Sequence, residues 1–295
     1  MPYPPEEYMP LCAIYNMEDG FVAAYDIDNE PIDSALWFPD PRIRARSVVE
    51  SIMKAPEGFE IDGYAMQLKL KEYADDVDES LHMPFCTGGD LDPRRLLLAY
   101  SFGIFPWFDI TDESPWWWAP LSRFVLFPDE IHISHSMRTL LNKKKYRVSI
   151  NEAFPEVIEA CRTVDGRYDD PQGAWLGEDI IKAYTELWRQ GYAKSVEVWE
   201  IGSGRLVGGL YGELLNGCFM GESMFSYVPS ASKVAMVGLC EWMKQTGGKV
   251  IDLQIETEHL KSMGGRYISY IDFLRMLNPE AAHAADAPLD IRYRQ

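Results

Sequence analysis

The 295-residue sequence has few cysteines and no long apolar run, and both absences restrict its class. Its five cysteines are widely spaced and never form a C-x-x-C pair, whereas disulfide frameworks and structural zinc sites use paired cysteines. No apolar stretch approaches the roughly 20 residues that cross a bilayer, and the first residues lack the basic and apolar segments of a secretion signal. We therefore expect reduced cysteines and a cytoplasmic protein that contacts no membrane.

Positive charge is also scarce. The chain has 28 Lys plus Arg against 46 Asp plus Glu, a formal net charge of −18, which excludes a generally basic surface that binds DNA. Residues 1–90 hold 6 basic and 19 acidic side chains, so most of the net charge lies there and the rest of the chain is nearly balanced. A local site for a polyanion is compatible with that part.

One basic segment stands out within it. Residues 121–150 carry 6 basic and 2 acidic side chains. The basic residues are Arg138, Lys143, Lys144, Lys145 and Arg147, with Arg123 nearby. Such a run is usually a solvated face, but in so acidic a chain it is the obvious candidate for contact with a polyanion.

The order of expected elements predicts an α+β fold. Runs rich in β-branched and aromatic residues indicate strands, and helical periodicity lies between them. Only one helix separates the last of four consecutive strands from the others, which favours an antiparallel meander with a later crossover strand. The expected strands are 124–127, 146–150, 195–201, 206–214, 218–225 and 250–255, and the expected helices are 152–162, 178–190, 230–246 and 269–277.

Three sites could carry chemistry. Asp252 and Gln254 are two residues apart on an expected strand, so alternation places both side chains on one face. Glu222 ends another strand in G-E-S-M-F-S. His259 is an acid/base candidate, although a lone histidine near a helix start is more often a cap or a packed side chain. For all of these, a structural network or a solvated face is an open alternative.

Several long motifs, in order, resemble the leucyl/phenylalanyl-tRNA–protein transferase family. The resemblance covers about residues 88–278, and a shorter upstream match is L-W-F-P-D-P at 36–41. The motifs are GGDLDPRRLLLAYSFGIFPWF (88–108), WWWAP (116–120), HISHSMRTLLNKKKYRVSIN (132–151), GAWLGEDIIKAY (173–184), SVEVW (195–199), LVGGLYG (206–212), GESMFS (221–226) and DLQIETEHLKSMGG (252–265).

This resemblance implies a domain plan. It implies a small N-terminal domain at 81–120, with a contribution from 34–41, and a GNAT-like acyltransferase domain at 121–280 with a mixed, mainly antiparallel sheet flanked by helices. We expect residues 1–80 to be an acidic extension that packs on the protein, with a tether for the acceptor's basic terminus as the alternative, and residues 281–295 to be a disordered tail.

It also implies the reaction and the partners. The expected activity moves Leu, Phe or Met from aminoacyl-tRNA to the α-amine of proteins that begin with Arg or Lys, which marks them for N-end-rule degradation. Aminoacyl-tRNA is then a substrate, because its ester is the activated group, and no cofactor or metal is expected. We expect a monomer that binds no DNA.

The family's site residues carry over position by position. Asp252 and Gln254 match the catalytic Asp-x-Gln, in which the Gln carbonyl orients the acceptor amine and the Asp either polarises that arrangement or collects the proton. Glu222 matches the glutamate that, together with Asp252, attracts the cationic end of the acceptor. The basic run 138–147 is the expected contact for the tRNA acceptor end. The matching positions for the aminoacyl-adenosine are Trp107, Trp175, Leu210, Phe219, Gly221, Met236, Leu239 and Ile251.

Two other functions stay open at this stage. One is a GNAT-type N-acyltransferase that uses acyl-CoA, for which the stretch 226–233 lacks the glycine-rich turn that would bind pyrophosphate. The other is a non-catalytic module that only recognises basic N-termini, in which Asp252 and Glu222 would bind without reacting.

Overall fold

A computed structural model of the chain falls into two compact units, and we describe each by itself. Unit 1 comprises Met1–Ser122 and Tyr270–Gln295, and unit 2 comprises Arg123–Ser269. The structure describes residues 12–16, 21–25, 86–87, 90–101, 103–108, 115–120, 122–164 and 176–277. The expected extension at 1–80 therefore lies almost wholly outside the described residues, and the expected tail at 281–295 lies outside them entirely.

Unit 2 is built on a seven-stranded mixed sheet in the order β12-β6-β11-β10-β9-β8-β7. Strands β7 to β10 form an antiparallel meander, β11 runs parallel to β10, and β6 is antiparallel to β11. This confirms the predicted meander with a later crossover strand. The strands are β6 (Ser122–Leu126), β7 (Tyr146–Ile150), β8 (Ala193–Glu200), β9 (Leu206–Leu215), β10 (Cys218–Ser226), β11 (Val250–Gln254) and β12 (Arg266–Ser269).

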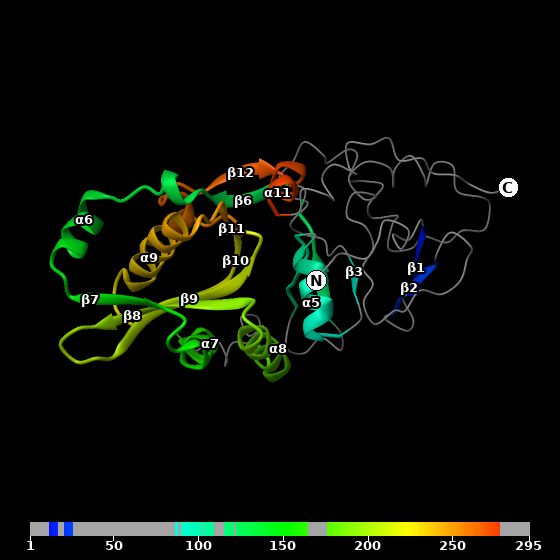
Figure 1. Ribbon diagram of the computed structural model, residues 1–295, viewed down its shortest axis with the longest axis horizontal. Helices are drawn as coiled ribbons and strands as arrows, with labels where there is room; N and C mark the ends of the chain where they lie inside the picture. The colour runs from blue at the N-terminus through cyan, green and yellow to red at the C-terminus, as the bar shows by residue number, and fades with distance from the viewer. Residues whose placement is uncertain are drawn as a thin grey trace. The chain divides into compact units, whose positions relative to one another are not determined.

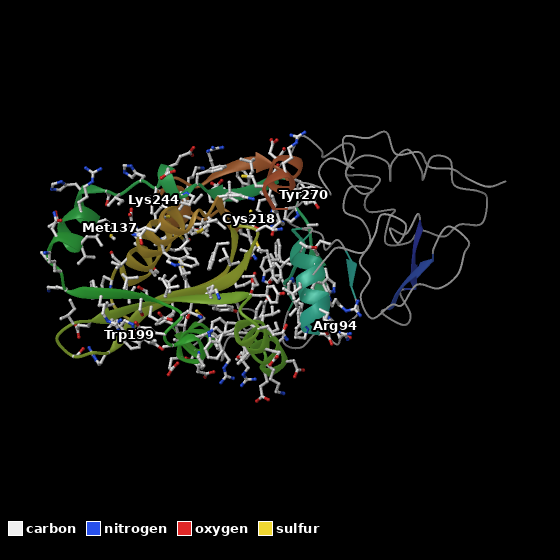
Figure 2. The ribbon with its side chains drawn as sticks, viewed as in Figure 1. Arg94, Met137, Trp199, Cys218, Lys244 and Tyr270 are labelled. Atoms are coloured by element: carbon white, nitrogen blue, oxygen red, sulfur yellow. The ribbon has the colours of Figure 1, made fainter. Side chains whose placement is uncertain are left out.

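Helices cover both faces of this sheet. Figure 1 shows α9 on one face and α7 and α8 on the other. The helices of unit 2 are α6 (His135–Asn142), α7 (Phe154–Thr163), α8 (Glu178–Arg189), α9 (Ala231–Thr246) and the short α10 (Glu258–Lys261), with a 3-10 turn at Pro128–Glu130. The α9 face of the core joins apolar side chains of the sheet to those of α9, and Met137 of α6, labelled in Figure 2, belongs to the same cluster.

Two glycines of β9 allow neighbouring elements to come close. A Cβ on Gly208 would lie 2.4 Å from the Cβ of Ala231, the first residue of α9. A Cβ on Gly212 would lie 1.9 Å from the carbonyl oxygen of Met220 in β10. Because only glycine fits such close approaches, these positions fix the start of α9 and the middle of β10 against β9.

The described part of unit 1 contains a small three-stranded sheet in the order β3-β5-β4, a two-stranded hairpin and two helices. Its strands are β1 (Cys12–Asn16), β2 (Phe21–Tyr25), β3 (Cys86–Thr87), β4 (Phe105–Pro106) and β5 (Trp116–Trp118), and its helices are α5 (Pro93–Ser101) and α11 (Tyr270–Leu277). Gly103 has φ +67, and a Cβ there would lie 3.0 Å from the ring of Phe273 in α11. The α+β class with a small N-terminal domain is confirmed, and the bounds 81–120 stay a prediction.

No helix within the described residues combines the length and apolar character that a bilayer crossing requires.

Candidate active site

A cavity opens in unit 2 where the parallel strands β10 and β11 separate. Their pairing runs from Cys218 opposite Val250 to Met220 opposite Asp252 and stops there, although β10 continues to Ser226. The cavity has a volume of about 480 Å³. It is lined by residues of β9, β10 and β11, the ends of α7 and α9, and α10 with the loop before it.

Two bulges turn polar side chains into this cavity. The register between β10 and β9 shifts between Gly221 and Ser223, so Glu222 is an extra residue in β10. The register between β11 and β6 shifts between Asp252 and Gln254, and Gln254 has φ +59, a left-handed conformation that is uncommon for a residue other than glycine. Bulges re-aim side chains and recur beside active sites.

Glu222 and Gln254 bond to each other across the gap between the strands. The Nε2 of Gln254 donates to Oε1 of Glu222 at 2.8 Å, and the hydroxyl of Tyr184 in α8 donates to Oε2 at 3.0 Å. The amide oxygen of Gln254 accepts no hydrogen bond from any described residue. It is therefore available to accept a hydrogen bond from a ligand in the cavity.

The side chain of Asp252 does not lie beside that of Gln254 on one face of the strand, as alternation predicted. Its carboxylate is fully buried, is not among the residues that line the cavity, and forms an ion pair with the buried Arg123 of β6. Its Oδ1 also accepts a hydrogen bond from the backbone N–H of Gln254 at 3.0 Å. The bulge between the two residues interrupts the alternation, so only Gln254 reaches the cavity.

Most of the positions that unit 2 was expected to supply to the aminoacyl-adenosine do line the cavity. Leu210, Phe219, Gly221, Met236 and Ile251 are all lining residues. Leu239 is fully buried in α9 but is not one of them. The arrangement is an apolar chamber next to one polar pair, as in sites that hold an apolar group and orient a reactive one.

Two further polar groups line the cavity, and the family motifs assign neither of them a role. The Tyr211 hydroxyl and the Nε2 of His259 are buried and have no hydrogen-bond partner within the described part of the chain. Burial raises the pKa of Tyr211 well above its usual value, so the hydroxyl stays protonated. Burial, and secondarily the charge of Lys233, lowers the pKa of His259, so its ring is neutral at pH 7.

Neither tryptophan expected at the adenosine belongs to the described part of unit 2. Trp107 belongs to unit 1, where its indole is 40% exposed and packs at 5.3 Å against that of Trp118. Trp175 lies outside the described residues. Their contact with an adenosine stays a prediction.

The basic run from Arg138 to Arg147 begins in α6, at the end of unit 2 opposite to α8 (Figure 1). Figure 1 shows α6 at one end of this unit and α8, which carries Tyr184, at the opposite end. All five basic side chains are exposed. Arg147 donates to both carboxylate oxygens of Glu152 at 2.9 Å and lies over Trp199. The other four form no ion pair with the described residues.

No group of three or more His, Cys, Asp or Glu side chains that could hold a metal ion occurs in the described ranges.

The comparisons with known proteins decide the family. The family model for leucyl/phenylalanyl-tRNA protein transferase matches residues 125–278, and the model for the N-terminal domain of the same proteins matches residues 89–121. The chain belongs to this family. It is 49% identical over 190 residues to the leucyl/phenylalanyl-tRNA--protein transferase of Flavobacterium johnsoniae, an alignment that covers 64% of this chain and 87% of the relative.

Other members of the family are almost as similar. The protein of the same name from Desulforapulum autotrophicum is 45% identical over 193 residues, which are 65% of this chain and 82% of the relative. The one from Hydrogenovibrio crunogenus is 43% identical over 201 residues, 68% of this chain and 76% of the relative. Among solved structures, FemX overlaps 87% of this chain and 81% of its own with a TM-score of 0.40 at 8% identity.

Two residues of the site have no signal in the local sequence that would have identified them. Tyr184 is the last residue of the G-A-W-L-G-E-D-I-I-K-A-Y motif, and nothing in the motif marks the tyrosine as a partner of Glu222. Arg123 looks like one more member of the basic segment, and no local pattern marks it as the partner of a carboxylate 129 positions later.

Proposed function

We propose that the protein transfers Leu, Phe or Met from aminoacyl-tRNA to the N-terminal α-amine of proteins that begin with Arg or Lys, as the family's name and motifs suggest. The observation that carries the proposal is the Gln254–Glu222 pair, which faces an apolar chamber. The motif resemblance expects both residues in the site. An apolar aminoacyl side chain in the chamber would bring its ester carbonyl beside that pair.

Gln254 orients the attacking amine in this proposal. Because its Nε2 is held by Glu222, its amide oxygen can accept an N–H of the acceptor amine and aim the nitrogen lone pair at the ester carbonyl. A new C–N bond forms, the bond from the carbonyl carbon to the ribose oxygen breaks, and the proton that the amine loses ends on that oxygen. An α-amine with a pKa of about 7.7–8.0 is partly neutral at cellular pH, so orientation supplies more of the rate than base catalysis.

Asp252 acts through Gln254 and is a positioning residue. Its carboxylate is engaged by Arg123 and by the backbone N–H of Gln254, and it does not reach the cavity. A buried carboxylate held in this way does not collect the proton of the acceptor. It fixes the left-handed conformation that directs the Gln254 side chain to Glu222.

Glu222 attracts the cationic end of the acceptor. The expectation was that Asp252 would share this role, but its charge is already balanced by Arg123. Tyr184 and Gln254, which donate to Glu222, are neutral groups, so the carboxylate keeps its charge while they hold it. An acceptor that begins with Arg or Lys brings a compensating charge.

The donor is held in two ways. The aminoacyl group lies against the apolar groups of the cavity in unit 2. An indole stacked on the adenosine base contributes about 1–3 kcal/mol, and for Trp107 and Trp175 this role stays a prediction. The tRNA acceptor end is attracted by the basic run from Arg138 to Arg147. Binding of tRNA is then steeply salt-dependent, whereas binding of a small aminoacyl-adenosine mimic is not.

The decisive experiment follows radiolabelled Leu from Leu-tRNA onto a peptide with N-terminal Arg, beside a peptide with N-terminal Ala. We expect transfer to the Arg peptide alone and its loss in Gln254→Ala. Peptide binding without transfer would support the module that only recognises basic N-termini. Transfer of an acyl group from acyl-CoA would support the N-acyltransferase alternative.

A further inference from the structure

His259 belongs to the cavity, but the proposed function does not use it. Its side chain lines the cavity, and its Nε2 is buried without a hydrogen-bond partner within the described part of the chain. It does not cap α10, because Thr257 does so by accepting the backbone N–H of Leu260 at 3.2 Å. The two ordinary roles of a histidine near a helix start, a cap and a satisfied core side chain, therefore do not account for it.

A buried ring nitrogen without a partner is unfavourable unless a ligand or water satisfies it. The cavity gives this nitrogen access to a ligand. A neutral imidazole has one N–H donor and one acceptor nitrogen, so its Nε2 suits a hydroxyl, which can both donate and accept. The charged group that acts on this ring from α9 is Lys233, and it favours the neutral form.

The place of His259 in the cavity wall indicates which part of the donor its side chain contacts. The apolar chamber takes the aminoacyl side chain, and Glu222 with Gln254 takes the acceptor amine. One part of the cavity wall runs from the end of β11 through Ile255 and Thr257 to His259 in α10. The ribose adjoins the ester carbonyl that lies beside the Glu222–Gln254 pair, so it is the next part of the donor to meet the wall of the same cavity.

We propose that the Nε2 of His259 forms a hydrogen bond with the ribose 2′-hydroxyl of the terminal adenosine and thereby positions the neighbouring 3′-oxygen, from which the aminoacyl group leaves. This inference rests on the proposed function. Atoms and charge balance as before: the amine's proton ends on the 3′-oxygen, and His259 neither gains nor loses one overall.

A cycle of two donors and two proteins tests this hydrogen bond. The donors are Leu-tRNA ending in adenosine and Leu-tRNA ending in 2′-deoxyadenosine, with Leu on the 3′-oxygen of both, and the readout is the single-turnover rate. We expect His259→Phe to slow the natural donor about fivefold to tenfold, the effect of roughly one hydrogen bond. On the 2′-deoxy donor the two proteins should differ by less than about twofold, because the partner hydroxyl is already absent.

Two further variants control the comparison. His259→Gln keeps a polar atom near the position of Nε2 and should remain within about threefold of the parent on the natural donor. His132→Phe changes an exposed histidine that does not line the cavity and should have no effect on either donor. Melting temperatures of all variants show whether each folds, and if His259→Phe does not, the same cycle with His259→Ala, which also removes the ring nitrogen, decides.

Each other outcome overturns the inference. An equal loss on both donors would mean that His259 only packs the cavity wall. Unchanged transfer from the natural donor in folded His259→Phe would mean that it has no role, and so would a parent protein that does not distinguish the two donors. If the parent transfers from neither donor while its tRNA binding is intact, the proposed function itself fails, and this inference with it.

Discussion

The backbone N–H of Gln254 donates to Oδ1 of Asp252 at 3.0 Å, and this bond joins the buried centre of unit 2 to its cavity. Asp252 is in turn paired with Arg123, and both side chains are at most 1% exposed. The hydrogen bond from its N–H therefore ties the left-handed backbone of Gln254 to an ion pair that is buried from solvent. The reactive amide is on the surface of the cavity, whereas the charges that orient it are in the core.

Removal of one partner of this pair should unfold the protein more readily. Asp252→Ala leaves the guanidinium of Arg123 buried without its carboxylate, which costs about 3–5 kcal/mol of unfolding free energy. Arg123→Met should cost a similar amount. The double variant Arg123→Met/Asp252→Leu should recover much of the loss, because an apolar pair of similar volume is tolerated. Chemical denaturation of the three variants measures this.

The same double variant separates stability from activity. It no longer has the carboxylate that holds the Gln254 N–H, so transfer of Leu should stay far below the parent although the protein is folded. Full recovery of transfer would show that Asp252 serves stability alone.

Gln254 can be tested for its side chain and its backbone at once. Gln254→Ala and Gln254→Gly both remove the amide, and each should lower transfer about 100-fold or more, as loss of an orienting polar group in an active site does. Gln254→Gly should be at least as stable as Gln254→Ala, because glycine adopts φ +59 without strain. An alanine variant that is clearly the more stable of the two would argue against the left-handed conformation.

Glu222→Gln tests the charge of the acceptor site with the shape kept. The new amide can still bond to Tyr184 and Gln254, so the melting temperature should change little. The KM for a peptide with N-terminal Arg should rise roughly tenfold or more, because hydrogen bonds to charged groups are about twice as strong as neutral ones. A drop in kcat at constant KM would instead assign Glu222 to the chemical step.

The sequence predicted the sheet well because its strands and helices have clear periods. The strands expected at 146–150, 206–214 and 218–225 correspond to β7, β9 and β10, and the expected helix 230–246 corresponds to α9. The short elements α6 and β12 were missed. A helix of two turns and a strand of four residues carry too few periods to stand out.

The site was predictable as a set of residues but not as a geometry. Glu222, Gln254 and most of the apolar chamber were named from motifs, and the structure brings them to one cavity. The separation of Asp252 from Gln254 was not predictable from alternation, because it depends on a bulge and a left-handed residue. Arg123 and Tyr184 meet their partners only through the tertiary fold.

Tyr211 provides a stability test in the same cavity. Its ring packs edge-on against Phe154 and Tyr184, and its buried hydroxyl has no partner within the described residues. Tyr211→Phe keeps the ring and removes the unsatisfied group, so it should raise the unfolding free energy by about 1 kcal/mol. Thermal denaturation in the absence of tRNA measures the gain. A loss of stability would mean that water or a residue outside the described ranges bonds to the hydroxyl.

The basic run can be divided by the partners that its members already have. Arg147 is engaged with Glu152, whereas Lys143, Lys144 and Lys145 form no ion pair with the described residues. Replacing the three lysines by Gln should weaken tRNA binding and reduce the slope of log K against log salt by up to about 0.9 for each phosphate that the variant no longer neutralises. The single variant Arg147→Gln should change the slope much less, since the arginine's charge is already compensated.

Filter binding of tRNA over a series of salt concentrations measures both slopes, with an aminoacyl-adenosine mimic as the control that should not respond. If the triple variant binds tRNA with the parent's slope, the acceptor end is held by another surface, and the basic run is only the solvated face that such runs usually are.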